Sequence, residues 1–420
     1  MERYTEYKNC PLSGIKEIPS HWRMHRIKWL LSERIEKSKD GVGEPLSMSQ
    51  KLGIVPTKEM DIIPNMASSY IGAKKVQQGD MVFNKLKAHL GVFAVSNFDG
   101  LVSPDYAVYI PTEKTYLPYL ELLLRTQYYI TEFQKKTTGV AIGLTRLYTD
   151  GLFGISAIYP PIAEQEKIVS YLDSKTSKID AYVADKEKEI LLLQELKQKT
   201  IAEAVTKGLN PNVKMKDSGI LWIGMIPEHW EVSRMKRIFS ESKEKTTDES
   251  GTLLSLSQYT GITLKDNAKK VGMFEAESTI GYNIVHSGQF VMNIMLAWNG
   301  SYAVSDYEGI ISPSYCVFNF NEDCESKYFH YLLRLTSYAG AFKTMSKGII
   351  ESRLRLYPLY FFTFKTIIPP LVEQQAIVAY IDEKCQKIDT LITELQAEIN
   401  YLKEYKQRLI ADVVTGQVKV

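Results

Sequence analysis

The sequence predicts two mixed α/β (α+β) globular domains in tandem, each followed by a long helix, with the two helices paired as an antiparallel coiled coil. Three observations predict this fold class: a repeat over nearly the whole chain, short strand-like runs within each copy, and a heptad pattern closing each copy. At 420 residues, the chain is too long for one ordinary hydrophobic core. We therefore expect an internal pseudo-twofold repeat of one unit.

The repeat is seen in motifs that recur at a nearly constant distance. Pro19-Ser20-His21-Trp22 recurs 208 residues later as Pro227-Glu228-His229-Trp230. From Ile71-Gly72, which matches Ile280-Gly281, the distance becomes 209 residues and then holds. Further matches at these distances are Leu46–Gln50 with Leu254–Gln258, Arg125 with Arg334, Arg146-Leu147-Tyr148 with Arg355-Leu356-Tyr357, and Pro160-Pro161 with Pro369-Pro370. A period this long indicates two duplicated domains rather than a solenoid.

The first part of each copy has the pattern of a mixed α/β globule. In the first copy, Met81–Phe83, Gly91–Val95 and Tyr106–Ile110 are predicted strands, because they are rich in β-branched and aromatic residues. Gly79-Asp80 and Asp99-Gly100 are predicted turns. Residues 118–133 have helical spacing of apolar residues, so one helix is expected there.

The second part of each copy is predicted to be a long helix that starts after Pro161 and after Pro370. Apolar residues recur at alternating steps of three and four, which is the seam of a coiled coil. Lys186 and Lys197 lie on the first seam and make it the weaker one. The predicted helix-pairing residues are Ile179, Val183, Ile190, Leu193, Ile388, Ile392, Leu395, Ile399 and Leu402. The alternative is that each helix packs only on its own globule.

These patterns divide the chain into four segments. The globular domains are expected over residues 1–160 and 208–369, and the long helices over 161–207 and 370–420. Gly208 and Pro211 end the first helix by the usual rules for helix termination.

Composition limits the class of protein. The formal net charge of +2 excludes a polycation, so any surface that binds nucleic acid must be a local one. The four cysteines are scattered and lack zinc-site spacing, which favours a reducing cytoplasm and predicts no metal site. No apolar signal core follows Met1, and no apolar run is long enough to span a membrane.

No catalytic motif stands out. Ser103-Pro104-Asp105-Tyr106 is faintly similar to the Asp/Asn-Pro-Pro-Tyr strip of adenine methyltransferases, but no glycine-rich cofactor motif accompanies it. The same residues would begin a PD…ExK nuclease pattern, yet no ExK follows, and the second copy has Ser314 in place of the acid. His21 and His229 are expected to be hydrogen-bonded structural residues beside a buried tryptophan. A duplicated chain without catalytic residues favours a binder of a two-part target.

Several of these motifs together resemble the specificity subunit of Type I restriction–modification systems. The resemblance rests on Ile18–Trp22 with Ile226–Val232, on Pro160–Gln165 with Pro369–Gln374, and on the junction from Thr206 to Ile220. It covers essentially the whole chain.

The resemblance implies that each globule is a target-recognition domain for one half of a bipartite site in double-stranded DNA. It also implies that the paired helices set the spacer and dock two adenine-methyltransferase subunits, which motor-nuclease subunits join. S-adenosylmethionine, ATP and magnesium would then belong to the partner subunits, and this chain would hold no cofactor.

Candidate DNA contacts are polar, basic and aromatic residues in turns, most of which differ between the copies. They are Gln50, Lys51, Lys85, Lys87, His89, Thr145 and Arg146 in the first domain, and Gln258, Tyr259, Asn299, Ser352, Arg353 and Arg355 in the second. Arg146 and Arg355 recur, so they suit a shared phosphate contact or a structural ion pair.

Three other functions remain open at this point. The chain is also compatible with the recognition subunit of a related Type II-like system, with a coiled-coil adaptor that does not bind DNA, and with an enzyme whose site is unrecognised.

Overall fold

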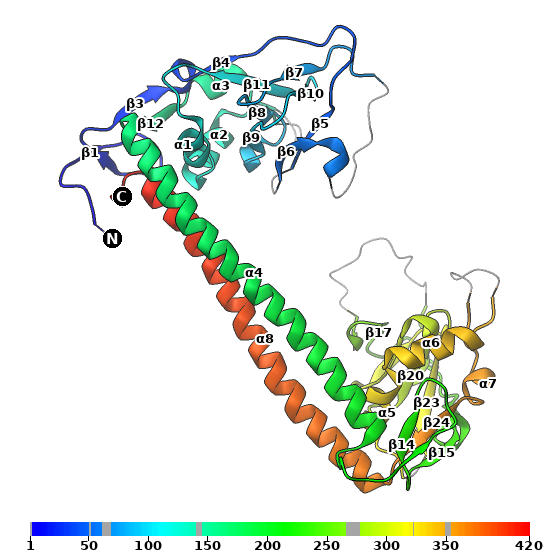
Figure 1. Ribbon diagram of the computed structural model, residues 1–420. Coiled ribbons are helices and arrows are strands. Elements are labelled where there is room, and N and C mark those ends of the chain that lie inside the picture. The colour runs from blue at the N-terminus through cyan, green and yellow to red at the C-terminus, as the bar shows by residue number, and fades with distance from the viewer. Residues whose placement is uncertain are drawn as a thin grey trace. The chain divides into compact units, whose positions relative to one another are not determined.

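The computed structural model describes residues 2–49, 52–60, 69–139, 145–265, 278–321, 323–348 and 354–420. The chain forms two compact units. Unit 1 comprises Met1–Glu187 and Gln396–Val420, and unit 2 comprises Lys188–Leu395. Each unit therefore contains one globule, one end of the first long helix and one end of the second, as the colours of Figure 1 show.

Unit 1 begins with a globule of short strands and helices. In chain order these are β1 (Tyr7–Asn9), β2 (Glu17–Pro19), β3 (Arg23–Arg26), η1 (Ile27–Trp29), β4 (Leu31–Glu33), β5 (Leu46–Ser49), β6 (Gly53–Pro56), η2 (Thr57–Glu59), β7 (Lys74–Val76), β8 (Met81–Asn84), η3 (Ala88–Leu90), β9 (Phe93–Val95), β10 (Gly100–Val102), β11 (Tyr106–Pro111), α1 (Leu117–Leu124), α2 (Gln127–Lys136), α3 (Thr149–Phe153) and β12 (Ser156–Tyr159). The long helix α4 (Ile162–Lys207) follows.

Unit 2 repeats this order. Its elements are β13 (Met215–Asp217), β14 (Met225–Pro227), β15 (Glu231–Arg234), η4 (Met235–Arg237), β16 (Phe239–Ser242), β17 (Leu254–Ser257), β18 (Gly261–Leu264), β19 (Asn283–Val285), β20 (Phe290–Asn293), η5 (Ala297–Asn299), β21 (Tyr302–Val304), β22 (Gly309–Ile311), β23 (Tyr315–Phe320), α5 (Ser326–Leu333), α6 (Thr336–Met345), α7 (Pro358–Phe361) and β24 (Lys365–Ile368). The second long helix, α8 (Leu371–Val414), closes the repeat.

The centre of each globule is a four-stranded antiparallel sheet. The strand order is β4-β11-β8-β9 in unit 1 and β16-β23-β20-β21 in unit 2. The register repeats as well, because Tyr106 pairs with Asn84 just as Tyr315 pairs with Asn293. In unit 1, Phe83 stacks on Phe93 with ring centroids 4.5 Å apart. The repeat in the sequence is thus a repeat of the fold, and the expected mixed α/β class is confirmed.

The helix expected over residues 118–133 is a different case, because the structure divides it into α1 and α2. Thr126 interrupts the helix with an extended backbone conformation, and its hydroxyl donates to the carbonyl oxygen of Leu123 at 2.7 Å. A threonine that bonds back to the preceding turn competes with helix continuation. The prediction of a single helix was therefore wrong.

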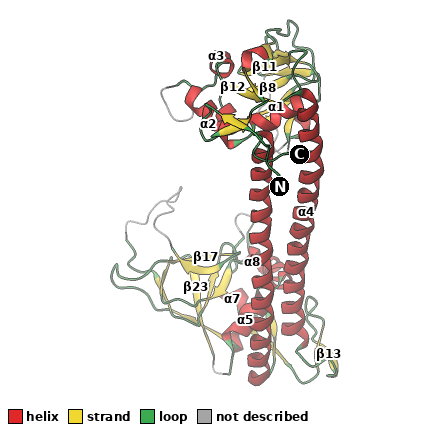
Figure 2. Ribbon diagram, turned by 90° about the vertical axis from the view of Figure 1, so that its left-hand side faces the viewer, coloured by secondary structure: helices red, strands yellow, loops and turns green. Residues whose placement is uncertain are grey.

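Within each unit, the parts of the two long helices that belong to it lie side by side (Figures 1 and 2) and run antiparallel. In unit 1, Asp180 pairs with Lys406 at 2.7 Å and Lys186 pairs with Glu398 at 2.7 Å. Residues further along α4 therefore pair with residues earlier in α8, which shows that the two helices are antiparallel. In unit 2, Lys197 pairs with Asp389 at 2.7 Å. The seam lysines thus reach carboxylates across the helix pair. Such exposed pairs add little stability, but they favour one register.

The predicted pairing residues lie along this seam with graded burial. Ile179, Val183, Ile388 and Ile399 are buried, while the other predicted residues of the seam are half-buried. These half-buried residues are Ile190, Leu193, Ile392, Leu395 and Leu402.

One carboxylate in the first turn of each long helix joins that helix to its globule. Glu164 accepts a hydrogen bond from the indole N–H of Trp22 at 2.8 Å and lies 2.7 Å from Nε2 of His21. Glu373 makes the same contacts with Trp230 at 3.0 Å and with His229 at 2.6 Å. Both indoles are fully buried, so their N–H groups need such a partner. The structural role expected for the two histidines is confirmed.

A tyrosine in each globule holds the end of the other long helix. The Tyr119 hydroxyl of α1 donates to the carbonyl oxygen of Val414 at 2.9 Å, and the Tyr328 hydroxyl of α5 donates to that of Val205 at 2.8 Å. The last carbonyl groups of a helix have no partner within the helix, so each tyrosine satisfies a group that would otherwise be buried and unpaired. Each globule therefore makes hydrogen bonds with the start of one long helix and with the end of the other.

Replacing Glu164 with alanine is expected to lower the free energy of unfolding by on the order of 2 kcal/mol. Trp22 would lose a charge-assisted hydrogen bond in a buried site. The measurement is chemical denaturation of the full chain. The matched control is Glu166→Ala, two residues further along α4, where the side chain is exposed. An equal loss in both variants would contradict a specific role for Glu164.

Candidate nucleic-acid interface

The turn after β8 displays three of the residues predicted to contact DNA. The Asn84 side chain accepts from the Leu86 amide at 3.1 Å, and the Lys87 amide donates to the Asn84 carbonyl at 2.9 Å. Gly91 closes the turn with a φ of 79°, a conformation that favours glycine. The turn leaves Lys87 exposed and Lys85 and His89 half-buried.

The turn after β20 has the same backbone and different side chains. The Asn293 side chain accepts from the Met295 amide at 3.0 Å, and Gly300 closes the turn with a φ of 83°. Leu296 occupies the position of Lys87 and is exposed as Lys87 is. Ile294 and Trp298 replace Lys85 and His89. Asn299, predicted as a DNA contact, lies within η5 at the end of this turn and is exposed.

A second segment lies beside each turn and brings the predicted arginine to it. The Leu147 amide donates to the Lys85 carbonyl at 2.9 Å, and Arg146 forms a bridge with Thr138. The Leu356 amide donates to the Ile294 carbonyl in the same way, so Arg355 has the equivalent place in unit 2. In unit 1 the structure thus brings Lys85, Lys87, His89, Thr145 and Arg146 into one region of the globule.

The electrostatics of this region in unit 1 favour an anion. Burial lowers the pKa of Lys85, and the positive charge of Lys74 lowers it further. Arg146 pairs with Asp105 at 3.4 Å. Among the described residues, Arg146 Nε and His89 Nδ1 are buried atoms without a hydrogen-bond partner.

The hairpin between β17 and β18 carries Gln258 and Tyr259, and its position is set by Arg334. This guanidinium donates to the Gln258 carbonyl at 2.6 Å and to the Tyr302 carbonyl at 3.0 Å. Tyr259 is 83% exposed, which leaves its ring free to meet a ligand. Arg125 in unit 1 likewise donates to the Phe93 carbonyl at 2.6 Å. Neither arginine was among the predicted contacts, although their recurrence in the repeat is the signal that identifies them as scaffold.

Four predicted contacts, Gln50, Lys51, Ser352 and Arg353, lie outside the described residues. The direct contacts of the others with DNA stay predictions.

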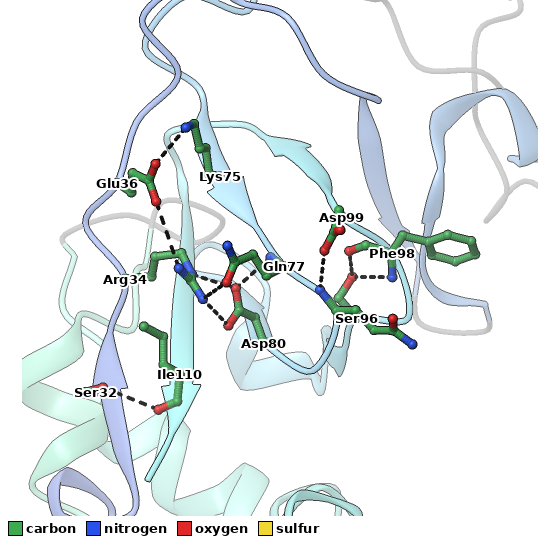
Figure 3. A network of polar contacts seen from close by, with 11 residues as sticks. Ser32, Arg34, Glu36, Lys75, Gln77, Asp80, Ser96, Phe98, Asp99 and Ile110 are labelled. Carbon is green, nitrogen blue, oxygen red and sulfur yellow. Dashed lines mark hydrogen bonds and ion pairs between the residues drawn. The ribbon is translucent and has the colours of Figure 1, made fainter.

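The turn between β7 and β8 is held by a polar network in unit 1 (Figure 3). The Arg34 guanidinium donates to both Asp80 carboxylate oxygens, at 2.7 and 3.0 Å, and to the Gln77 side chain at 2.8 Å. The backbone N–H of Gln77 also donates to the Asp80 carboxylate, at 2.8 Å. Asp80 is buried, so its charge requires this pairing.

The equivalent turn of unit 2 replaces the ion pair with neutral amides and adds a histidine. The Gln289 side chain accepts from the His286 amide at 2.7 Å and donates to Asn319 at 2.6 Å. Both ring nitrogens of His286 face carboxylates, Glu244 and Glu308, each at 2.9 Å. An ionised carboxylate only accepts hydrogen bonds, so this geometry requires a protonated ring. Hydrogen bonds from the ring to Glu244 and Glu308 raise the pKa of His286.

Unit 2 is therefore expected to lose local stability as the pH rises. A group with a raised folded pKa stabilises fully below its unfolded pKa, near 6.5, and this contribution is lost as the pH passes the raised folded pKa. Amide hydrogen exchange of β19 at pH 6 and pH 8.5 measures it, after correction for intrinsic rates. His286→Gln introduces the residue that unit 1 has at this position. It should reduce the difference in the protection of β19 between pH 6 and pH 8.5. An undiminished difference in this variant would contradict the assignment to His286.

The outer surface of the helix pair carries apolar residues that recur with the repeat. Tyr182, Leu192 and Leu196 on α4 are exposed, and so are their counterparts 209 residues later, Leu391, Tyr401 and Tyr405 on α8. In unit 1 the Asp180–Lys406 pair sets Tyr182 at the level of Tyr405, because each directly precedes a seam residue. In unit 2 the Lys197–Asp389 pair sets Leu196 at the level of Leu391 by the same argument. We call Tyr182, Tyr401 and Tyr405 the tyrosine patch, and Leu192, Leu196 and Leu391 the leucine patch.

Comparison with known proteins agrees with this arrangement. The family model described as the Type I restriction modification DNA specificity domain matches residues 227–401. The chain is 20% identical to the type I restriction enzyme MjaX specificity subunit of Methanocaldococcus jannaschii, over 100% of this chain and 98% of that protein. Among the described residues, no helix has the length and apolar character needed to cross a membrane.

Two solved structures share the fold. One belongs to a study of complex assembly and conformational transition in the type I R-M system, and it matches with a TM-score of 0.70 and 15% identity over 96% of this chain and 99% of that chain. The other is the HsdS subunit from Thermoanaerobacter tengcongensis, with a TM-score of 0.55 and 14% identity over 97% and 100% of the two chains.

Proposed function

We propose that this chain is a specificity subunit of the Type I restriction–modification family, and that each of its globules reads one half of a bipartite site in double-stranded DNA. The family model that matches residues 227–401 and the specificity subunit that aligns with the whole chain support this proposal. The helix pair formed by α4 and α8 would set the spacer between the half-sites and dock two adenine-methyltransferase subunits. S-adenosylmethionine, ATP and magnesium would be bound by methyltransferase and motor-nuclease partners, and this chain would contribute recognition without catalysis.

The observation that carries the proposal is a constant turn with variable side chains. The turns after β8 and β20 share their backbone hydrogen bonds and their closing glycines, yet they present Lys85, Lys87 and His89 in one unit and apolar residues in the other. Two readers of different half-sites need different side chains on one fixed backbone, and these two turns have that arrangement. Side chains that protrude from a fixed scaffold are the usual means of reading base edges.

The docking proposal rests on the tyrosine and leucine patches. Solvated helix faces are normally polar, so three exposed apolar residues at equivalent places in both halves require a common explanation. Because the patches are related by the repeat, they suit two copies of one partner rather than two different proteins.

Methylome sequencing tests the recognition proposal. A host that carries this chain with its neighbouring methyltransferase gene should show methylated adenine in both halves of a split motif with a fixed spacer. Deletion of the gene for this chain should abolish that methylation, because the methyltransferase would lose its reader. Methylation that persists without the chain would overturn the proposal and favour the adaptor function.

Native mass spectrometry tests the docking proposal. Tyr405→Glu should remove one methyltransferase subunit from the complex and Leu196→Glu the other, because each introduces a charge into an apolar contact. We expect the affected site to weaken by more than about tenfold, as for the central residues of protein interfaces.

The matched controls are Gln407→Glu and Gln198→Glu. They introduce the same charge at exposed positions two residues further along each helix, on the other side of the seam residue. Controls that lose partners as readily as the patch variants would place the docking surface elsewhere.

A further inference from the structure

The two turns after β8 and β20 differ in a way that bears on the physical forces used by each globule. At three equivalent positions, unit 1 has Lys85, Lys87 and His89, and unit 2 has Ile294, Leu296 and Trp298. The 3-10 helices η3 and η5 that follow begin with nearly identical backbone angles, with φ of −123° at Lys87 and −125° at Leu296. The backbone therefore presents both sets of side chains in the same directions.

The residues around the two turns also differ. Lys343 and Lys347 lie near the turn of unit 2, at positions where unit 1 has Gln134 and Thr138. In unit 1, Lys74 lies near enough to Lys85 to lower its pKa. The equivalent residue in unit 2 is Asn283, which donates to the Tyr315 carbonyl at 2.8 Å. Arg146 and Arg355 are common to both. Lys74 and Arg146 of unit 1 pair with Glu33 at 3.3 Å and with Asp105 at 3.4 Å, so Lys85 and Lys87 supply the excess positive charge at this place.

The turn of unit 2 is organised for apolar contact. The Trp298 indole donates to the Met295 carbonyl at 2.9 Å, and the Lys343 ammonium lies 5.5 Å from the centre of its ring. These contacts fix the indole beside the turn. Leu296 is 42% exposed at the position where unit 1 has Lys87. Apolar side chains read DNA chiefly through the methyl group of thymine, and they contribute nothing to the neutralisation of phosphates.

We propose that the two globules bind their half-sites by different forces: the turn after β8 through charge, with Lys85 and Lys87 on phosphates, and the turn after β20 through apolar contact, with Ile294 and Leu296 on base edges. This inference rests on the proposed function and deepens it. Of the salt dependence that the two turns contribute to DNA binding, most would then come from the turn of unit 1. Lys85 and Lys87 would add long-range attraction to DNA, whereas Ile294 and Leu296 act only on contact.

The magnitude follows from counterion release. Each phosphate contact steepens the dependence of log affinity on log salt by about 0.9. Two lysine contacts thus account for a slope of about 1.8, which is roughly a 12-fold loss of affinity between 50 and 200 mM salt.

Reciprocal exchange of the turns tests the proposal. Lys85→Ile with Lys87→Leu gives unit 1 the side chains of unit 2, and Ile294→Lys with Leu296→Lys makes the converse change. Each full-length variant, in complex with its methyltransferase, is titrated against a duplex carrying the motif that methylome sequencing defines, from 50 to 200 mM KCl. We expect the first exchange to reduce the slope by about 2 and the second to increase it by a similar amount.

A matched control removes two lysines from the same globule elsewhere. Lys16→Ile with Lys114→Leu makes the same change of charge in the β1–β2 connection and beyond the far end of β11, away from the Tyr106–Asn84 pair at the turn. The control should leave the slope nearly unchanged. Circular dichroism melting curves check that each variant folds. Because the scaffold already carries each introduced chemistry at the equivalent position, we expect little loss of stability.

The outcomes separate the two proposals. If the unmodified complex does not prefer its motif over a scrambled duplex, the proposed function fails. If the preference holds but both exchanges leave the slope unchanged, or the control changes it equally, the assignment of charge to the turn of unit 1 is overturned.

Discussion

The architecture depends on one carboxylate in the first turn of each long helix. Glu164 and Glu373 are favoured at these positions by the helix dipole, and each also satisfies the N–H of a fully buried indole. A buried donor without a partner would cost more than most single contacts provide. The indole, the histidine beside it and the helix start are therefore fixed together, and the direction in which each helix leaves its globule follows from that contact.

The surroundings of these indoles explain another recurrent feature. Gly208 has a φ of 73°, and a Cβ there would lie 3.2 Å from Cζ2 of Trp230. Gly416 also has a positive φ, and a Cβ there would collide with Pro19. Only glycine allows the end of one long helix to pass so close to the tryptophan that fastens the start of the other. The Pro-x-His-Trp motifs that recur in the sequence thus build the contact between each globule and the long helices. The residues that differ lie on the turns that this scaffold supports.

Much of the fold could be predicted from the sequence because duplication reports which residues the scaffold needs. The repeated Pro-x-His-Trp, the proline pairs and the heptads led directly to the globules and the helix pair. The break between α1 and α2 was missed, since apolar spacing alone does not register a threonine that bonds to its own preceding turn. Recurrence marks Arg125 and Arg334 as scaffold residues, but their partners were missed. These partners, like those of Tyr119 and Tyr328, are backbone carbonyls, which a sequence pattern does not identify. The sequence could place the candidate DNA contacts in turns. It could not identify which of them touch DNA, because the repeat marks only the residues that the two copies share.

Unit 2 is one continuous stretch of chain, Lys188–Leu395, whereas unit 1 combines Met1–Glu187 with Gln396–Val420. During synthesis, every residue of unit 2 is added to the chain before the last segment of unit 1. The globule that is translated first is therefore the second to be completed. Until the last segment is added, the seam of its part of α4 is uncovered and the Tyr119 hydroxyl lacks the carbonyl of Val414. Closing that joint brings together residues separated by almost the whole chain, which is the slow class of folding step. Assembly of this protein thus ends in the globule that is translated before the other.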